Sequence, residues 1–279
     1  MSEIAELDLR TVSDVTVREL RLTEFGDAAQ LLGRGMCDNP ANVRVFGISA
    51  GERRVQVLAR FFAPVLCGLY QRGLLLGAFR DGTLVGACAL ARPGFCQPTT
   101  IEKLRLVPAV MFGNPPGTTL RVLRWAGEWA RRDPPGPHWH LGPVAVDPPF
   151  QGQGIGSSML SAFCACMDEY GAVSYLETDK SENVRFYRRF GFELATQAEV
   201  LGIPNWFMSR LPQIAPARRP TGLPRDDKTP NFTHSPANSS ETCGASGAVA
   251  PRPPPPASVR LSAIRLEPVR LKLGGPSAA

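Results

Sequence analysis

A glycine-rich turn between an apolar strand and an amphipathic helix constrains this chain more than any other feature of its sequence. The turn is the run Gln151-Gly152-Gln153-Gly154-Ile155-Gly156, which follows the apolar stretch 141–146 and opens a helical pattern over 155–170. The first backbone N–H groups of a helix lack intrahelical partners, and the helix macrodipole adds positive character there. Because glycines let a ligand approach this backbone closely, the segment predicts a site for a pyrophosphate.

Three kinds of phosphate-binding turn combine a strand, a glycine-rich turn and a helix. A P-loop requires Gly-x-x-x-x-Gly-Lys-Ser/Thr, whereas Gly156 is followed here by Ser157 and Ser158, with no lysine. The dinucleotide fingerprint Gly-x-Gly-x-x-Gly requires its third glycine where Ser157 stands, within a repeated βαβ unit that we do not find in the sequence. The pattern that fits is Gln/Arg-x-x-Gly-x-Gly/Ala, which Gln151, Gly154 and Gly156 satisfy.

A second motif lies downstream of the turn. Residues 173–178 have the character of another strand, and the segment Asn183-Val-Arg-Phe-Tyr187-Arg-Arg-Phe-Gly191-Phe192 follows it. Together, the two motifs resemble the acyl-CoA-binding motif and the Asn…Tyr-x-x-x-Gly-Phe signature of the GNAT N-acetyltransferase superfamily. The resemblance is continuous from about residue 138 to residue 192, and from residue 15 onward the order and lengths of the elements also agree.

This resemblance implies an α/β (α+β) fold with a mixed, mostly antiparallel central sheet flanked by helices. In such a sheet the two central strands splay apart as a V, and the gap between them forms the cleft. We expect these strands at 138–146 and 173–178. Pro143 supports the splay, because a proline removes a ladder donor and, inside a strand, indicates a bulge.

Periodicity and turn signals predict the other elements. We expect an opening strand at 15–22, a hairpin over 74–91 that turns at Asp81-Gly82, and a closing hairpin from 194–200 and 205–211. Helices are expected from about residue 27, over 52–70 with a kink or interruption at Pro64, and over 119–131. The connection 92–137 exceeds what a minimal core of this family needs, so we expect acceptor selection there.

The resemblance implies acetyl-CoA as co-substrate, with its pantetheine arm lying in the gap like an extra strand. The backbone groups expected to contact this arm belong to Val144, Ala145 and Val146. The residues expected to hold the pyrophosphate are Gln151, Gly152, Gln153, Gly154, Ile155 and Gly156. Asn183 is expected to hydrogen-bond the arm, and a helix N-cap is its alternative role. No metal ion is expected, because Cys164 and Cys166 would point to different sides of their helix.

Acyl transfer to an amine requires that one proton be removed and another supplied. An alkylammonium has a pKa near ~10.4, so freeing the amine at pH 7 costs roughly 4–5 kcal/mol. The family resemblance gives Tyr187 the role of general acid toward the departing thiolate, and ordinary packing in an aromatic helix face is the alternative. Candidates for the base are His140, His138 and Glu177. The backbone N–H of Val146 is a candidate to polarise the thioester carbonyl.

Composition divides the chain near residue 212, so we expect a single GNAT-type domain over 1–212. Residues 213–279 are rich in Pro, Ser, Ala and Arg and contain one aromatic residue, Phe232, so we expect a disordered tail. This tail carries nine basic and four acidic residues, and hence +5 of the net charge of +6. Because the remainder is nearly neutral, we expect no specific nucleic-acid partner.

The sequence predicts an enzyme that moves an acetyl group from acetyl-CoA to a primary amine of a small-molecule or peptide acceptor, by direct transfer in a ternary complex. The alternative is a non-catalytic acyl-CoA-binding module whose tail engages a partner. We find no secretion signal and no run of about 18 apolar residues, so we expect a cytoplasmic protein without membrane contact. Seven scattered cysteines predict free thiols. A monomer or a homodimer is expected.

Overall fold

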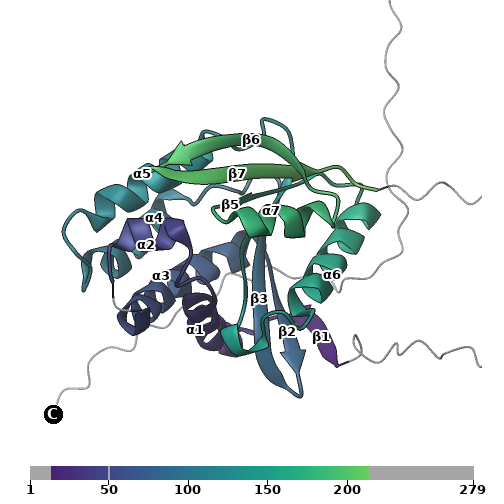
Figure 1. Ribbon diagram of the computed structural model, residues 1–279, viewed down its shortest axis with the longest axis horizontal. Coiled ribbons are helices and arrows are strands. Elements are labelled where there is room, and N and C mark those ends of the chain that lie inside the picture. Colours follow the sequence, from purple (N-terminus) through teal and green to yellow (C-terminus); the bar gives the residue numbers. More distant parts are fainter. Residues whose placement is uncertain (1–13, 50, 214–279) are drawn as a thin grey trace, which may run out of the picture. The chain divides into compact units, whose positions relative to one another are not determined.

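A mixed sheet carries the fold in the computed structural model, which describes residues 14–49 and 51–213 (Figure 1). Within these ranges, seven strands form the sheet in the order β1-β2-β3-β4-β5-β7-β6. Their bounds are β1 (Val15–Glu19), β2 (Gly73–Arg80), β3 (Thr83–Ala91), β4 (Trp139–Val146), β5 (Ser174–Thr178), β6 (Glu193–Val200) and β7 (Ile203–Arg210). The β4–β5 pair is parallel and the other pairs are antiparallel, which confirms the predicted mostly antiparallel sheet.

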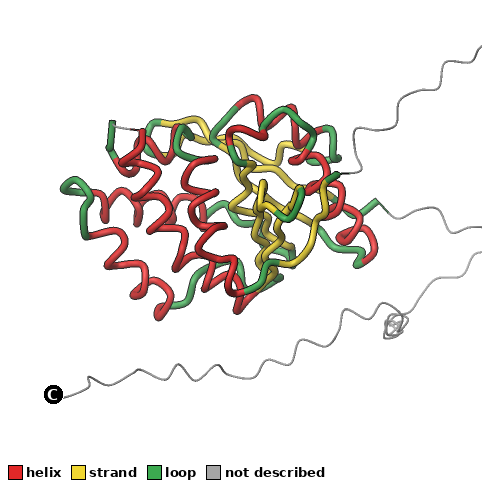
Figure 2. Tube along the Cα trace, turned by 90° about the horizontal axis from the view of Figure 1, so that it is seen from below, coloured by secondary structure: helices red, strands yellow, loops and turns green. Residues whose placement is uncertain are grey.

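Helices lie on both sides of the sheet, as Figure 2 shows. Those packed on one side are α1 (Phe25–Gly35), α2 (Pro40–Phe46), α3 (Gly51–Arg72), α4 (Thr100–Met111) and α5 (Thr118–Ala130). Those on the other side are α6 (Ile155–Glu169) and α7 (Ser181–Arg188). Among these helices, none is both long and apolar enough to cross a membrane.

Strand β3 separates the two hydrophobic cores because its side chains alternate between the faces of the sheet. Ala87, Ala89 and Ala91 pack in the core with α1 and α3, whereas Cys88 and Leu90 pack in the core with α6 and α7. A strand buried on both faces needs an almost continuous apolar sequence, and β3 has one. The small alanines also let the helices of the first core lie close to the sheet.

The two central strands separate soon after they begin. Strands β4 and β5 pair at Trp139↔Ser174 and His140↔Tyr175. No further pair between them follows in the described part of the chain, although β4 continues to Val146 and β5 to Thr178. The predicted V between the central strands is confirmed.

The predicted bulge is also present in β4. The pairing of β4 with β3 is regular at Cys88↔Val144 and resumes at Leu90↔Leu141. Two residues of β4, Gly142 and Pro143, therefore occupy the space opposite one residue of β3. This insertion bends β4 at the point where it leaves β5.

Two glycines in the last turn of α1 let this helix lie directly against α3 and β4. A Cβ atom on Gly33 would lie 2.7 Å from the carbonyl oxygen of Val55 in α3. A Cβ atom on Gly35 would lie 2.9 Å from the carbonyl oxygen of Val146 in β4. Because these obstacles are backbone atoms and, for Gly35, also the Cβ atom of Ala145 at 2.8 Å, none can move aside without shifting an element that shapes the cleft.

We predict that Gly33→Ala lowers the free energy of unfolding by about 1–3 kcal/mol, since the new methyl group overlaps the backbone of α3. The matched control is Gly26→Ala on the same helix, where an added Cβ meets nothing within 4 Å. This control should be neutral or stabilising by up to about 1 kcal/mol, because alanine favours the helix over glycine. Denaturant unfolding of both variants tests the prediction, and equal stabilities would contradict it.

The structure corrects two expectations about the helices. Helix α3 continues through Pro64 without the predicted interruption. Its buried face, which includes Phe61, Phe62 and Leu66, stabilises the helix against the loss of one backbone hydrogen bond. The connection 92–137 contains α4 as well as the predicted α5, and α2 was not predicted.

The predicted tail lies outside the described residues, apart from Gln213, so the domain boundary stays a prediction.

Candidate active site

A cavity of about 280 Å³ opens where β4 and β5 diverge. One side of it is formed by His140 and residues 142–144 of β4, by residues 177–179 at and just beyond the end of β5, and by Asn183 and Tyr187 of α7. Five of the residues predicted for the site therefore line one cavity, namely Val144, His140, Glu177, Asn183 and Tyr187. The sheet topology brings them together, although the first and the last of them are 47 positions apart in the chain.

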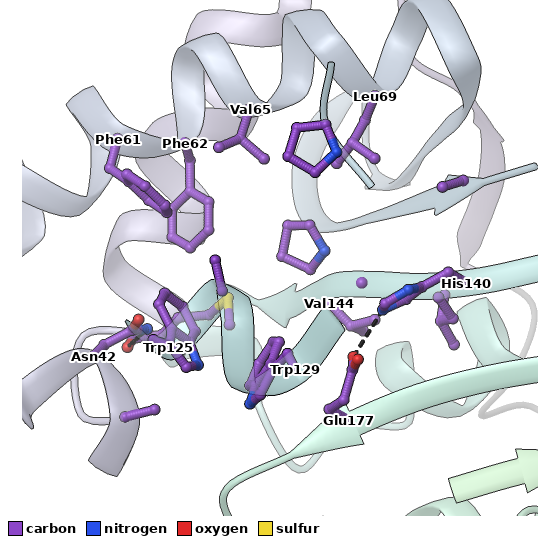
Figure 3. A pocket seen from close by; sticks show the side chains of 18 of the residues that line it. Asn42, Phe61, Phe62, Val65, Leu69, Trp125, Trp129, His140, Val144 and Glu177 are labelled. Carbon is purple, nitrogen blue, oxygen red and sulfur yellow. Dashed lines mark hydrogen bonds and ion pairs between the residues drawn. The ribbon is translucent and has the colours of Figure 1, made fainter. Parts of the chain in front are cut away.

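The opposite side of the cavity is apolar and aromatic (Figure 3). Its lining side chains come from α3 (Phe61, Phe62, Val65, Leu69), α4 (Leu106) and α5 (Val122, Trp125, Trp129). The indole rings of Trp125 and Trp129 meet edge to face with centroids 4.8 Å apart. The Trp129 indole N–H donates to Asn205 Oδ1 at 3.0 Å, which fixes the orientation of this ring. A molecule bound here would contact carboxylates on one side and aromatic rings on the other.

His140 and Glu177 form a partly buried ion pair across the first residues of the gap. His140 Nε2 donates to Glu177 Oε2 at 2.7 Å, and the Glu177 side chain is only 2% exposed (Figure 3). Burial disfavours the charged imidazolium, but Glu177, Cys96 and Asp133 outweigh burial and raise the pKa of His140 to about 10. At neutral pH His140 is therefore a donor to Glu177 and a poor base. Glu177 Oε1 is buried and has no hydrogen-bond partner among the described residues.

Tyr187 is a buried side chain that reaches the cavity from α7. Its ring packs against those of Phe186 and Phe192, with centroids 5.4 and 5.9 Å away. Burial, assisted by Cys88 and Asp179, raises the pKa of the Tyr187 phenol above its ordinary value. The phenol therefore keeps its proton at neutral pH and is available as a donor. Aromatic packing and a donor role are compatible in this geometry.

Asn183 does not cap its helix. The N-cap of α7 is Lys180, so the alternative role predicted for Asn183 is wrong. The Asn183 side chain donates instead to Thr178 Oγ1 at 3.1 Å, and this bond turns it toward the end of β5. Asn183 is also one of the residues that line the cavity.

The glycine-rich turn has the backbone conformation that its sequence predicts. Gly152 and Gly154 have φ values of 76° and 82°, in the left-handed region that favours glycine. Gly154 is the N-cap of α6, and no side chain caps this helix. The N–H groups of its first turn, including those of Ile155 and Gly156, are therefore not paired within the helix. Gln151 folds back, and its side chain donates to the Val146 carbonyl at 3.0 Å.

The structure adds Arg80 to the residues around this turn. Arg80 lies at the end of β2, and its guanidinium donates to Gln153 Oε1 at 2.5 Å. The two residues are 73 positions apart. No local pattern marks such a contact, because it depends on the position of the β2–β3 hairpin beside α6. The positive charge of Arg80 and the partial positive charge at the N-terminus of α6 both favour an anion at this turn.

His138 does not line the cavity. Its Nδ1 donates to the Gly136 carbonyl at 2.8 Å, and its Nε2 lies 3.4 Å from the sulfur of Cys96. The three candidate bases are therefore unequal: Glu177 lies in the cavity with a free oxygen, His140 holds Glu177, and His138 faces Cys96.

Comparison with known proteins identifies the family. Residues 51–192, just over half of the chain, match the acetyltransferase (GNAT) family. The chain belongs to the GNAT acetyltransferase family. Its co-substrate is acetyl-CoA, as the two sequence motifs predicted.

A solved structure shares this fold. A crystal structure described as histone acetyltransferase HPA2 and related acetyltransferase, from Corynebacterium glutamicum, is 22% identical with a TM-score of 0.55. The alignment covers 72% of this chain and 98% of that one. The PaiA N-acetyltransferase of Thermoplasma acidophilum, solved with coenzyme A, is 15% identical with a TM-score of 0.44, and the alignment covers 71% of this chain and 98% of that one. The first likeness shows that the fold is shared.

Proposed function

We propose that this GNAT protein transfers the acetyl group of acetyl-CoA directly to a primary amine, within a ternary complex of enzyme, acetyl-CoA and acceptor. The observation that carries the proposal is the position of Glu177 and Tyr187 in one cavity at the opening between β4 and β5. The first is a base with an unused oxygen, and the second is a protonated phenol. A non-catalytic acyl-CoA-binding module would need neither group.

The pantetheine arm is proposed to lie along β4. The N–H of Asp147 donates to the Val85 carbonyl at 2.9 Å, so Asp147 and Val85 form a hydrogen-bonded pair. Hydrogen-bonded and non-hydrogen-bonded pairs alternate in an antiparallel ladder. The backbone N–H and C=O groups of Val144 and Val146 therefore point away from β3 and into the gap. An extended amide chain such as pantetheine satisfies these groups in place of a strand.

The pyrophosphate is proposed to bind the turn of residues 151–156. The unpaired N–H groups at the start of α6 supply hydrogen bonds, the helix dipole favours the negative charge, and Arg80 adds a cation. The Val146 carbonyl already accepts from Gln151, which fixes the end of β4 beside the turn. Asn183, near the end of β5, contacts the arm between the pyrophosphate and the cavity.

Gly156 allows a test of this placement that leaves the fold intact. A Cβ atom there would meet only Phe186 Cζ at 3.5 Å and Val146 Cγ2 at 3.7 Å, which are ordinary contacts. It would nevertheless occupy the proposed path of the cofactor between β4 and α7. We expect Gly156→Ala to keep the wild-type melting temperature and to weaken CoA binding by about tenfold, or about 1.4 kcal/mol. Gly156→Val should weaken binding further.

Isothermal titration with CoA measures this effect. Gly127→Ala on α5 is the control, since a Cβ atom there meets nothing within 4 Å and lies outside the turn. Its CoA affinity should equal that of the wild type. Unchanged affinity in a folded Gly156→Val variant would show that the turn does not bind the phosphates.

The chemical step follows from the two side chains in the cavity. Glu177 accepts a proton from the acceptor ammonium while His140 holds its other oxygen. The freed amine attacks the acetyl carbonyl, whose oxygen would accept from a backbone N–H of β4, that of Val144 in the cavity rather than that of Val146 beside the turn. The carbon–sulfur bond then breaks, Tyr187 donates its proton to the departing thiolate, and the second proton that the amine nitrogen loses restores the Tyr187 phenol. The products are CoA and an N-acetylated amine.

The apolar side of the cavity predicts the character of the acceptor. The aromatic side chains of α3 and α5 favour a molecule that joins its amine to an aromatic or branched aliphatic group. A polyamine would leave these surfaces without a partner. The amine itself would lie next to Glu177.

Thiol release from acetyl-CoA, measured with a panel of such amines, tests the function. We expect amine-dependent release, and we expect Tyr187→Phe to lower kcat and kcat/KM together by roughly 10²–10⁴-fold while CoA affinity stays unchanged. The control is Tyr170→Phe, because Tyr170 is 55% exposed and lies outside the cavity. A decrease below about threefold in Tyr187→Phe would remove the acid role from this residue. CoA binding without release for any amine would favour the non-catalytic module.

A further inference from the structure

One cysteine and two histidines converge beside the cavity. His138 and His140 lie two positions apart at the start of β4, so their side chains point to the same side of the strand. Cys96 reaches them from the connection that follows β3. The Cys96 sulfur and one ring nitrogen of each histidine all lie within 4.8 Å of one another.

The separation of two of these atoms matches a metal site. A tetrahedral Zn²⁺ with bonds of about 2.3 Å to sulfur and about 2.0 Å to nitrogen separates the two ligand atoms by about 3.5 Å. Cys96 Sγ and His138 Nε2 are 3.4 Å apart. These two ligand atoms therefore need little movement to bind one ion.

One ring nitrogen of each histidine is hydrogen-bonded to a group outside the cluster, and the other ring nitrogen is left as the candidate metal ligand. The bond from His138 Nδ1 to the Gly136 carbonyl, 2.8 Å long, places the proton on Nδ1 and the lone pair on the nitrogen facing Cys96. His140 Nε2 is bonded to Glu177, so Nδ1 is its remaining ligand atom, and the imidazolium loses its Nδ1 proton when an ion binds. Metal-ligating histidines are oriented in this way by carboxylates and backbone carbonyls.

Two buried atoms at the cluster are without hydrogen bonds. His140 Nδ1 and Asp133 Oδ1 lie 3.8 Å apart, and neither has a hydrogen-bond partner in the part of the chain that the structure describes. The other carboxylate oxygen of Asp133 accepts from Gln97, which fixes the orientation of Asp133. Buried polar atoms without partners are uncommon in folded proteins and require an explanation. A metal ion that replaces the Nδ1 proton would contact both atoms.

We propose that Cys96, His138 and His140 bind a divalent transition-metal ion of the zinc class, with Asp133 beside the fourth coordination position. A thiolate with two imidazoles selects such ions over Mg²⁺ or Ca²⁺, which prefer oxygen ligands. A cysteine binds such an ion as its thiolate, so metal binding releases the thiol proton.

The proposed ion takes no part in acetyl transfer, which uses Glu177 and Tyr187, and the proposal does not depend on the proposed function. Instead, the ion would tie the connection after β3 to the start of β4, next to the His140–Glu177 pair. The sequence does not suggest this site, because Cys96 and His138 are 42 residues apart and no short motif joins them.

Titration of the metal-free full-length chain with Co²⁺ tests the proposal. Binding should produce the near-ultraviolet charge-transfer absorption of a thiolate–cobalt bond with one ion per chain, and Zn²⁺ should displace it. Cys96→Ser should abolish this absorption. It should also weaken Zn²⁺ binding by more than the roughly 10–100-fold that is typical when a residue that only hydrogen-bonds a metal ligand is replaced. His138→Gln should have a similar effect. Cys67→Ser is the matched control, because Cys67 is an exposed cysteine on α3.

Thermal unfolding gives a second readout that also reports on folding. Zn²⁺ should raise the melting temperature of the wild type and of Cys67→Ser but not that of Cys96→Ser, while the metal-free proteins melt alike. The absence of a thiolate–cobalt absorption in the wild type would overturn the proposal. Its persistence in folded Cys96→Ser would equally overturn it.

Discussion

The divergence of β4 and β5 after His140 is the constraint on which the site depends. A continuous sheet would pair the backbone groups of Val144 and Val146 with a neighbouring strand and would leave no room between the layers. Because the strands separate, these groups face an open gap, and buried backbone groups require partners. The same separation creates the cavity that contains Glu177 and Tyr187. One departure from regular pairing thus accounts for both the cofactor path and the position of the catalytic groups.

The N-terminal helices hold the two arms of the V. Arg34 of α1 forms two hydrogen bonds with Asp147 at the end of β4, at 2.9 and 2.7 Å. Asp179, at the end of β5, accepts the backbone N–H of Ala41 in α2 at 2.6 Å. Bidentate arginine–carboxylate pairs and carboxylate–amide bonds have well-defined geometry. Helices α1 and α2 therefore fix the width of the gap, although they contribute little to the chemistry.

Short sequence patterns correctly predicted the turns, because the backbone conformation of a turn depends on the few residues within it. The Asp81-Gly82 turn takes positive φ at both residues and fixes its hairpin, and the glycines of the phosphate turn behave similarly. The sequence could not choose among the three candidate bases, because the pKa of His140 depends on the 2.7 Å contact with Glu177 across the gap. Arg80 and Cys96 were missed for a related reason: their partners are distant in the chain, so the sheet order decides these contacts.

A crystal structure with bound acetyl-CoA tests the central claim most directly. The account predicts the pyrophosphate oxygens about 3 Å from the N–H groups of residues 152–156 and the pantetheine amides paired with Val144 and Val146. It further places the thioester sulfur within hydrogen-bond reach of the Tyr187 hydroxyl, directly or through one water. A cofactor bound outside the gap between β4 and β5, or a sulfur on the far side of the cavity from Tyr187, would contradict the account.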